Sequence, residues 1–228
     1  MQFKKAALAI GLNLTPEMSI QFESYYQFLT KQNEVMNLTA ITDKEEVYTK
    51  HFLDSIHLTK AGNFENASLL DVGSGAGFPS IPLKIVCPKA KITIVDATMK
   101  RIDFLTQLSA KLGILDNQLI HGRIEDFKKK NSFDFVTARA VAKLNILTEL
   151  CLPFVKVGGL FIAMKSTHYE EELVEAFPSI HELGGQFREV ILYPLDNDLS
   201  HALIIIEKMR KTTDEYPRTF AQIKKKPL

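Results

Sequence analysis

The chain has 228 residues, of which 46% are hydrophobic, so it can bury the core of one α/β domain with a smaller appendage, and its composition excludes disorder. Its two cysteines, Cys87 and Cys151, lie far apart in apolar segments, which excludes a disulfide framework and a zinc knuckle and predicts a reduced, cytoplasmic setting without a bound metal. No apolar run is long enough to cross a membrane, and the segment after Lys4-Lys5 has no signal-peptide cleavage site. We therefore expect no membrane association.

The net charge of +1 conceals an uneven distribution. Residues 208–228 carry seven Lys and Arg against two Asp and Glu, which gives this tail a charge of +5 and leaves the remainder slightly acidic. Such a tail is expected where a protein meets phosphate groups, and Lys224, Lys225 and Lys226 are its clearest candidates. The alternative is a solvated basic tail without a partner.

Two helices are predicted before residue 65. Thr15 and Pro16 are typical of a helix start, and the apolar residues that follow recur at helical spacing along one face. A second helix begins at the capping sequence after Asp43 and extends to about Lys60, beyond a polar hinge at residues 37–39. We expect residues 1–65 to form a helical cap over the following domain. From the pattern alone, His51 and Asp54 are interpreted as polar residues on the surface of the second helix.

A buried strand over residues 69–72 runs into three alternating glycines, Gly73, Gly75 and Gly77. Glycines let the backbone adopt positive φ and approach a ligand closely, and the next helix presents free N–H groups. A second strand, over residues 91–96, ends in Asp96, where a carboxylate can hold the hydroxyls of a ribose. The two features predict a site for an adenosine-bearing ligand, and the alternative is a tight turn without a ligand.

The glycine spacing indicates which ligand this is. Phe78 stands where the dinucleotide fingerprint has its third glycine, so NAD and FAD are disfavoured. The pattern is similar to that of class I methyltransferases, which bind S-adenosylmethionine. In that arrangement Asp71 faces the cationic methionine end, Gly73 and Gly75 make room for it, and Asp96 accepts both ribose hydroxyls.

From Ser68 onward, strands and helices alternate, which predicts a parallel sheet for the core at residues 66–207. Ile124 and Glu125 follow the third strand and are candidates to flank adenine. The fourth strand, residues 133–138, delivers Arg139 to the same edge; its alternative role is a surface ion pair. The fifth, after a Gly158-Gly159 turn, ends at Lys165, and residues 189–193 and 201–207 form a closing hairpin around residues 196–198. The acidic run Glu170–Glu172 suits the start of a helix near His168 and is given no function.

Several motifs together resemble, in order and spacing, the bacterial 16S rRNA guanine-N7 methyltransferases known as RsmG or GidB. They are Asn37-Leu38-Thr39, His51-Phe52-Leu53-Asp54-Ser55, Gly73 to Pro79, Lys100-Arg101, Arg139-Ala140, Met164-Lys165 and Tyr216-Pro217-Arg218. Three departures from the family pattern are Ser80, Ser166 and the segment Thr219-Phe220-Ala221.

The resemblance implies a class I, Rossmann-like methyltransferase: a seven-stranded, mostly parallel sheet with an N-terminal helical cap. It implies S-adenosylmethionine contacts at Gly73, Phe78, Ile124, Glu125 and Arg139, and catalysis assisted by Arg139 and Lys165. The expected partner is 16S rRNA, within a small ribosomal subunit or an assembly intermediate, bound by a monomer through Lys100, Arg101, Arg218 and the tail lysines. A methyltransferase acting on a protein or small molecule, and a non-catalytic assembly factor, are the alternatives.

Overall fold

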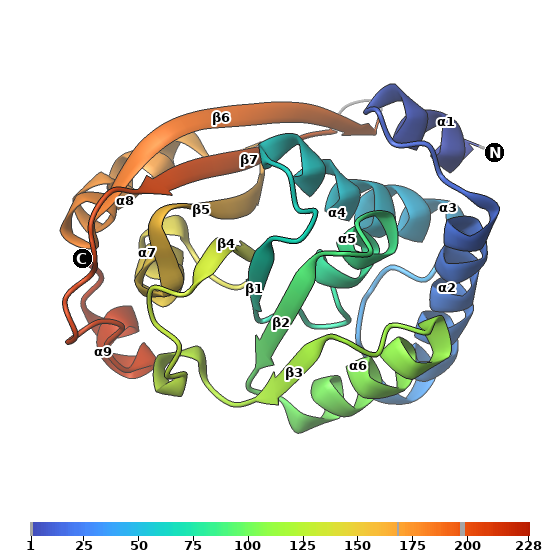
Figure 1. The fold of residues 1–228 in the computed structure, drawn as a ribbon, viewed down its shortest axis with the longest axis horizontal. Helices are drawn as coiled ribbons and strands as arrows, with labels where there is room; N and C mark the ends of the chain where they lie inside the picture. The colour runs from blue at the N-terminus through green and yellow to red at the C-terminus, as the bar shows by residue number, and fades with distance from the viewer. Residues whose placement is uncertain (1, 168, 197–198) are drawn as a thin grey trace.

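A computed structural model describes residues 2–167, 169–196 and 199–228 and shows a seven-stranded sheet with helices on both faces (Figure 1). The strand order is β3-β2-β1-β4-β5-β7-β6. Strands β1 to β5 pair in parallel, and β7 runs antiparallel to both β5 and β6. The mostly parallel sheet closed by a hairpin is therefore confirmed. The strands are β1 (Ser68–Val72), β2 (Lys91–Asp96), β3 (Gln118–His121), β4 (Phe133–Arg139), β5 (Val155–Ser166), β6 (Gly185–Asp196) and β7 (Leu199–Lys208).

The helices have the following bounds: α1 (Gln2–Ala9), α2 (Pro16–Met36), α3 (Lys44–Glu46), α4 (Asp54–Ile56), α5 (Ser80–Val86), α6 (Met99–Leu112), α7 (Leu144–Cys151), α8 (Glu170–Glu182) and α9 (Phe220–Lys225). Segment η1 (Val47–Leu53) is a π-helix, and η2 (His57–Ala61), η3 (Ile124–Asp126) and η4 (Leu152–Phe154) are 3₁₀-helices. Within the described part of the chain, no helix combines the length and the apolar character needed to span a bilayer.

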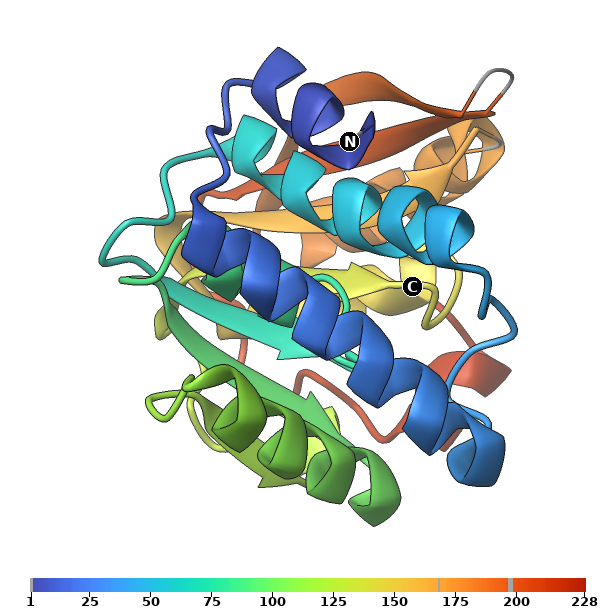
Figure 2. The ribbon, with the colours of Figure 1, turned by 90° about the vertical axis from the view of Figure 1, so that its right-hand side faces the viewer.

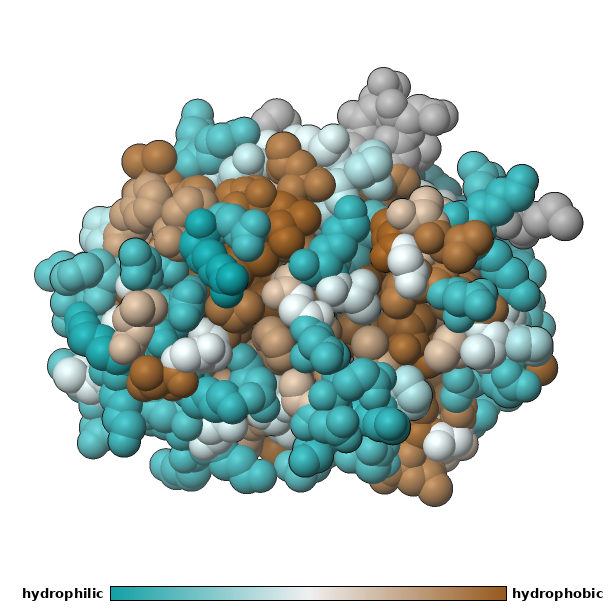
Figure 3. Space-filling view, turned by 45° about the horizontal axis from the view of Figure 1, so that its top comes forward, coloured by the Kyte–Doolittle hydropathy of each residue, from teal (hydrophilic) through white to brown (hydrophobic). Residues whose placement is uncertain are grey.

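The sheet separates two apolar cores. Side chains alternate between the faces of a strand, so Ile162 of β5 belongs to one core and Phe161 to the other. The first core lies beneath α2, α5 and α6, and the second beneath α7 and α8. Apolar residues also reach the surface around α8 and β6, where Val174, Phe177 and Leu192 are exposed among polar side chains (Figure 3).

The N-terminal helices pack against the face that carries α5 and α6, as Figure 2 shows for α2. The predicted start of α2 is confirmed, because the Thr15 hydroxyl accepts a hydrogen bond from Met18 N. Tyr25 and Phe52 are buried in the same core as Leu105 of α6. Residues 2–65 therefore share their core with the sheet.

The predicted helix from Asp43 to about Lys60 is a continuous helical run with changing geometry. It passes from α3 through the π-helix η1 and α4 to the 3₁₀-helix η2. A π segment is rare and is frequently found at functional sites. Here it contains His51 and comes directly before Asp54.

Two predictions at β5 and the closing hairpin differ from the structure or fall partly outside the described residues. Gly158 and Gly159 do not precede the strand as a turn but lie within β5, where the register with β4 shifts between Phe133↔Val155 and Phe135↔Leu160. The extra residues form a bulge, and Gly158 has φ +81°. The hairpin strands are longer than predicted, and part of the predicted turn, residues 197–198, lies outside the described residues, as does residue 168.

Candidate functional site

The carboxyl ends of the parallel strands meet at one edge of the sheet, where two cavities open. The glycine-loop cavity, of about 490 Å³, is lined by residues that include Gly73, Gly75, Phe78, Asp96 and Arg139. The Lys165 cavity, of about 450 Å³, is lined by residues that include Asp54, Arg139, Lys165, Glu172 and His201. His51, Arg139 and Ala140 line both cavities, so they form a wall that the two share.

Backbone atoms of the glycine loop line the cavity, and side chains at its glycines would fill space or strain the backbone. Gly73 and Gly75 have φ of +72° and +60°, in the left-handed region that favours glycine. A Cβ on Gly75 would point into open space, and one on Gly73 would meet Val141 at 3.0 Å. Gly77 has a different role, because a Cβ there would strike Tyr25, Ile81 and Leu105. Two of the three glycines therefore shape the cavity, and the third permits helix packing.

Asp96 lies at the end of β2 and lines the cavity. Its Oδ2 accepts a hydrogen bond from Gly75 N at 3.2 Å and lies 3.4 Å from Arg101 Nη1, and its Oδ1 accepts one from Thr98 N at 2.9 Å. The carboxylate thus ties the glycine loop to β2, and its predicted contact with a ribose stays a prediction.

Asp71 lies outside the cavity wall, unlike the prediction that it faces a ligand. Ser80 Oγ donates a hydrogen bond to its Oδ2 and holds the fully buried carboxyl against the start of α5. Its Oδ1 has no hydrogen-bond partner among the described residues. Burial raises the pKa of Asp71 to about 7, opposed by the hydrogen bond from Ser80. Ser80, one of the departures from the family pattern, therefore supplies the hydrogen bond that holds this buried carboxyl.

Ile124 and Glu125 also lie outside the lining of both cavities. Ile124 is buried in the second core, and Glu125 Oε1 accepts a hydrogen bond from Phe220 N at 3.1 Å. This bond places α9 beside η3. The predicted adenine contacts stay a prediction.

Arg139 is fixed in place by the end of the π-helical segment and by Asp54, which follows it. Its Nη1 donates to Asp54 Oδ2 at 2.7 Å and to the backbone oxygen of Lys50 at 3.3 Å. Its Nη2 lies 3.1 Å from His51 Nδ1, and its guanidinium carbon lies 5.0 Å from the centre of the Phe78 ring. Arg139 is therefore not an exposed surface residue but a held donor in the wall between the cavities.

Asp54 is the centre of this cluster and is 1% exposed. Its Oδ1 accepts hydrogen bonds from Tyr193 Oη and His201 Nδ1, both at 2.8 Å, while its Oδ2 faces Arg139. Burial alone would raise the pKa of Asp54, but the hydrogen bond from His201 and the charge of Arg139 outweigh it and hold that pKa below its ordinary value. The interpretation of Asp54 as a surface residue was wrong, because the closing hairpin covers it.

His51 is likewise buried instead of lying on a helix surface. Burial and the neighbouring Arg139 charge lower its pKa to about 4, so the ring is neutral at pH 7. Because Nδ1 accepts from Arg139, the proton is on Nε2, which donates to Thr39 Oγ1 at 2.8 Å. The ring also stacks on Phe78 with 4.5 Å between centroids. His51 thereby links the predicted polar hinge to the shared wall.

Lys165 and Glu172 form a second ion pair, 2.6 Å apart, in the wall of the Lys165 cavity. Lys165 lies at the predicted end of β5, whereas Glu172 belongs to the acidic run that was predicted only to suit a helix start. Tyr193 and His201 were also not among the predicted site residues. Only the tertiary structure places these three residues in the site, since α8 and the hairpin bring them to the sheet edge from distant parts of the chain.

The predicted RNA-binding residues fall into two groups. Lys100, Arg101 and Lys224 to Lys226 are exposed. Arg218 instead donates from Nε and Nη2 to Glu149, at 2.8 and 2.5 Å, and Glu149 is fully buried. Lys208 is buried too, and burial followed by the charge of Arg210 lowers its pKa to about 7. The predicted phosphate contact of Arg218 is therefore corrected, because its guanidinium is committed to holding the tail on α7.

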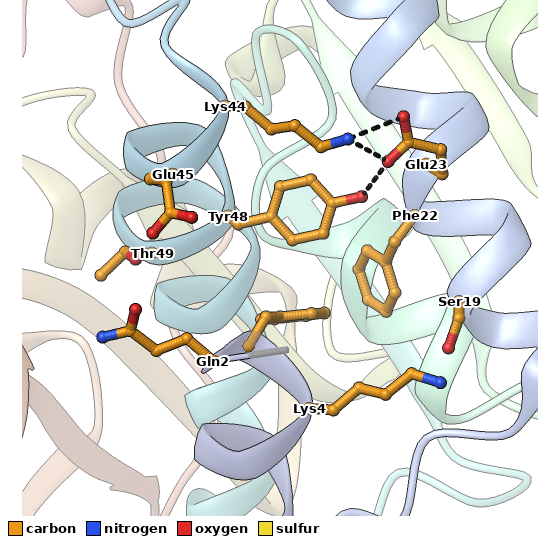
Figure 4. A pocket seen from close by; sticks show the side chains of 10 residues that line it. Gln2, Lys4, Ser19, Phe22, Glu23, Lys44, Glu45, Tyr48 and Thr49 are labelled. Carbon is orange, nitrogen blue, oxygen red and sulfur yellow. Dashed lines mark hydrogen bonds and ion pairs between the residues drawn. The ribbon is translucent and has the colours of Figure 1, made fainter.

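A third cavity, of about 280 Å³, lies between α1, α2 and the α3–η1 run. Figure 4 shows Lys44 and Tyr48 turned toward the Glu23 carboxylate, with Tyr48 Oη 2.9 Å from Glu23 Oε2. These polar groups satisfy one another, and the cavity shares no lining residue with the two cavities at the strand ends. We therefore place the functional site at the shared wall.

Comparisons with known proteins identify the family of the chain. The family model described as GidB, rRNA small subunit methyltransferase G, matches residues 18–190. The chain belongs to this family. A "Ribosomal RNA small subunit methyltransferase G" of Bacillus cytotoxicus is 48% identical, with 100% of this chain and 98% of the relative covered. The protein of the same name from Staphylococcus haemolyticus is 49% identical over 96% of this chain and 93% of its own length.

Solved structures that resemble this GidB family member show the fold. TYW2 of M. jannaschii in complex with AdoMet has a TM-score of 0.56 at 16% identity, covering 68% of this chain and 77% of its own. A SAM-dependent methyltransferase from Aquifex aeolicus also has a TM-score of 0.56, at 18% identity, covering 72% of this chain and 94% of its own. The fold is that of class I, Rossmann-like methyltransferases, as predicted.

Proposed function

We propose that the protein transfers a methyl group from S-adenosylmethionine to N7 of a guanine in 16S ribosomal RNA. The observation that carries this proposal is that two cavities adjoin at the strand ends, because His51, Arg139 and Ala140 line both of them. One cavity lies against a glycine loop and suits the methyl donor, and the other suits the acceptor base. Family membership supports the choice of small-subunit rRNA as substrate.

The residues of the glycine-loop cavity fit S-adenosylmethionine. Gly75 leaves open space beside the backbone, and Asp96 offers a carboxylate for the ribose hydroxyls. Phe78 supplies an apolar surface, and Arg139 supplies a planar cation for a carboxylate. When bound, the cofactor supplies an electrophilic methyl group on its sulfonium. Gly73 lines the same cavity, so the cofactor contacts predicted at Gly73 and Arg139 are part of this proposal.

The shared wall is suited to orienting an acceptor. Guanine N7 has an in-plane lone pair and needs no deprotonation, so the site requires no general base. This agrees with a neutral His51 whose two ring nitrogens are engaged by Arg139 and Thr39. Fixed donors and exclusion of water can then carry much of the rate through positioning.

The RNA target is expected in a loop. N7 faces the deep groove of A-form RNA, which side chains cannot readily enter, so the guanine must be unpaired or turned out of the helix. Lys100, Arg101 and the exposed lysines of the tail can contact the phosphates around it. We propose that a cytoplasmic monomer acts on a small subunit or an assembly intermediate.

The test is methyl transfer by the purified protein with labelled S-adenosylmethionine and either free 16S rRNA or small subunits. We expect label on N7 of one guanine, mapped by the strand cleavage that 7-methylguanine permits. Arg139→Lys keeps the charge but loses the planar fork and should be severely impaired at saturating cofactor and RNA. Arg188→Lys on the exposed face of β6 is the matched control. Transfer to protein or small molecules only, no transfer, or wild-type rates in Arg139→Lys would contradict the proposal.

A further inference from the structure

The Lys165 cavity contains an acceptor and a donor side by side in the pair formed by Glu172 and Lys165. We propose that these two residues recognise the Watson–Crick edge of the target guanine, with Lys165 donating to O6 and Glu172 accepting from N1–H and the N2 amine. This inference rests on the proposed function and names the groups that select guanine as its acceptor.

The contacts of the pair leave hydrogen-bonding capacity on both side chains, which line the cavity. Glu172 Oε2 accepts from Lys165 Nζ at 2.6 Å and from Leu144 N at 2.8 Å, which uses both of its lone pairs. Lys165 Nζ also donates to Ala142 O at 2.8 Å. With respect to the residues that the structure describes, Glu172 Oε1 and the third Nζ–H of Lys165 therefore stay available to a ligand.

The neighbouring donor and acceptor match the groups of guanine next to N7. Arg139 of β4 is in register with Met164 of β5, so Lys165 directly follows the residue paired with Arg139, and Glu172 of α8 lies against Lys165. A guanine whose N7 faces the methyl donor presents O6 next, and then N1–H and N2–H. Adenine in the same pose presents an amino donor toward the ammonium group and an acceptor toward the carboxylate. The pair therefore favours guanine and opposes adenine.

A purely structural role for Glu172 is the competing explanation, because its bond to Leu144 N caps the start of α7. That role uses Oε2 alone. Glu172→Gln keeps an oxygen for the cap while it removes the carboxylate charge, so the two roles predict different effects on base selection.

The experiment compares RNA substrates with guanosine or inosine at the target position, since inosine lacks only the N2 amine. For the wild-type protein we expect inosine to lower kcat/KM by about tenfold or more, the usual effect of losing a hydrogen bond to a charged group. In Glu172→Gln, kcat/KM for guanosine should fall by a similar factor, and the guanosine-to-inosine ratio should approach one. Glu175→Gln, an exposed position on the same helix, should keep the wild-type ratio.

Three outcomes would overturn the inference. A wild-type ratio in Glu172→Gln would leave Glu172 with the capping role only, and a wild-type protein that uses inosine as well as guanosine would remove the N2 contact. The second measurement needs no variant, so it stands even if Glu172→Gln unfolds. A wild-type protein that methylates neither RNA would overturn the proposed function as well, which separates that failure from the first two.

Discussion

Replacing Asp54 by Asn should destabilise the protein strongly. The side chain is 1% exposed and faces donors on both oxygens: Arg139 at one, and Tyr193 and His201 at the other. An amide is isosteric, but it carries no charge and turns an NH₂ group toward one set of these donors. The substitution therefore leaves the Arg139 cation, whose side chain is 16% exposed, without its counter-charge.

The size of the effect follows from the burial of the pair. Removing one partner of a buried ion pair costs about 3–5 kcal/mol, because the other charge stays desolvated. In a protein of this size, each kcal/mol lowers the melting temperature by roughly 2–4 °C. We therefore expect the Asp54→Asn variant to melt about 6–20 °C below the wild-type protein.

Urea denaturation and differential scanning calorimetry measure this difference directly. Asp103→Asn, the same chemical change at an exposed position of α6, is the control and should stay within about 0.5 kcal/mol of the wild type. A loss below about 1 kcal/mol in Asp54→Asn, the size expected of an exposed pair, would refute the argument that the hairpin desolvates this cluster.

Asp96→Ala should weaken S-adenosylmethionine binding by about 1.5–3 kcal/mol, because it removes a charged hydrogen-bond partner; calorimetric titration measures this, and a change below roughly twofold would remove Asp96 from the site. Replacing Lys224, Lys225 and Lys226 together by Ala should leave cofactor affinity unchanged and flatten the dependence of log K for RNA on log salt by about 0.7–0.9 per lost phosphate contact; an unchanged slope would indicate a solvated tail. Acidification from pH 6.5 toward 4 should lower the free energy of unfolding, because the unfolded chain binds protons at His51 and His57, whose pKa values burial lowers to about 4 in the folded protein. Each histidine lowers the free energy of unfolding by up to about 1.4 kcal/mol per pH unit of acidification. Asp71, whose raised pKa of about 7 has the opposite effect, offsets one of the two histidines. Denaturation curves that coincide at pH 6.5 and 5 would therefore contradict these shifts.

The sequence by itself determined the features that depend on neighbouring residues. The cap at Thr15, the stop of α6 at Gly113 and the positive φ of the glycine loop follow from local backbone chemistry. The alternation of strands and helices likewise determined the parallel sheet, and with it the meeting of Asp96, Arg139 and Lys165 at one edge.

Only the tertiary structure decided which polar groups are buried and paired. Asp54 meets His201, 147 residues away, and Arg218 meets Glu149, 69 residues away. No local pattern encodes such contacts, because a charged residue on a helix has the same sequence signal whether solvent or a hairpin covers it. The same reason explains Glu172: its position in an acidic first turn suits the helix dipole, and only the packing of α8 against α7 and β6 brings it to Lys165.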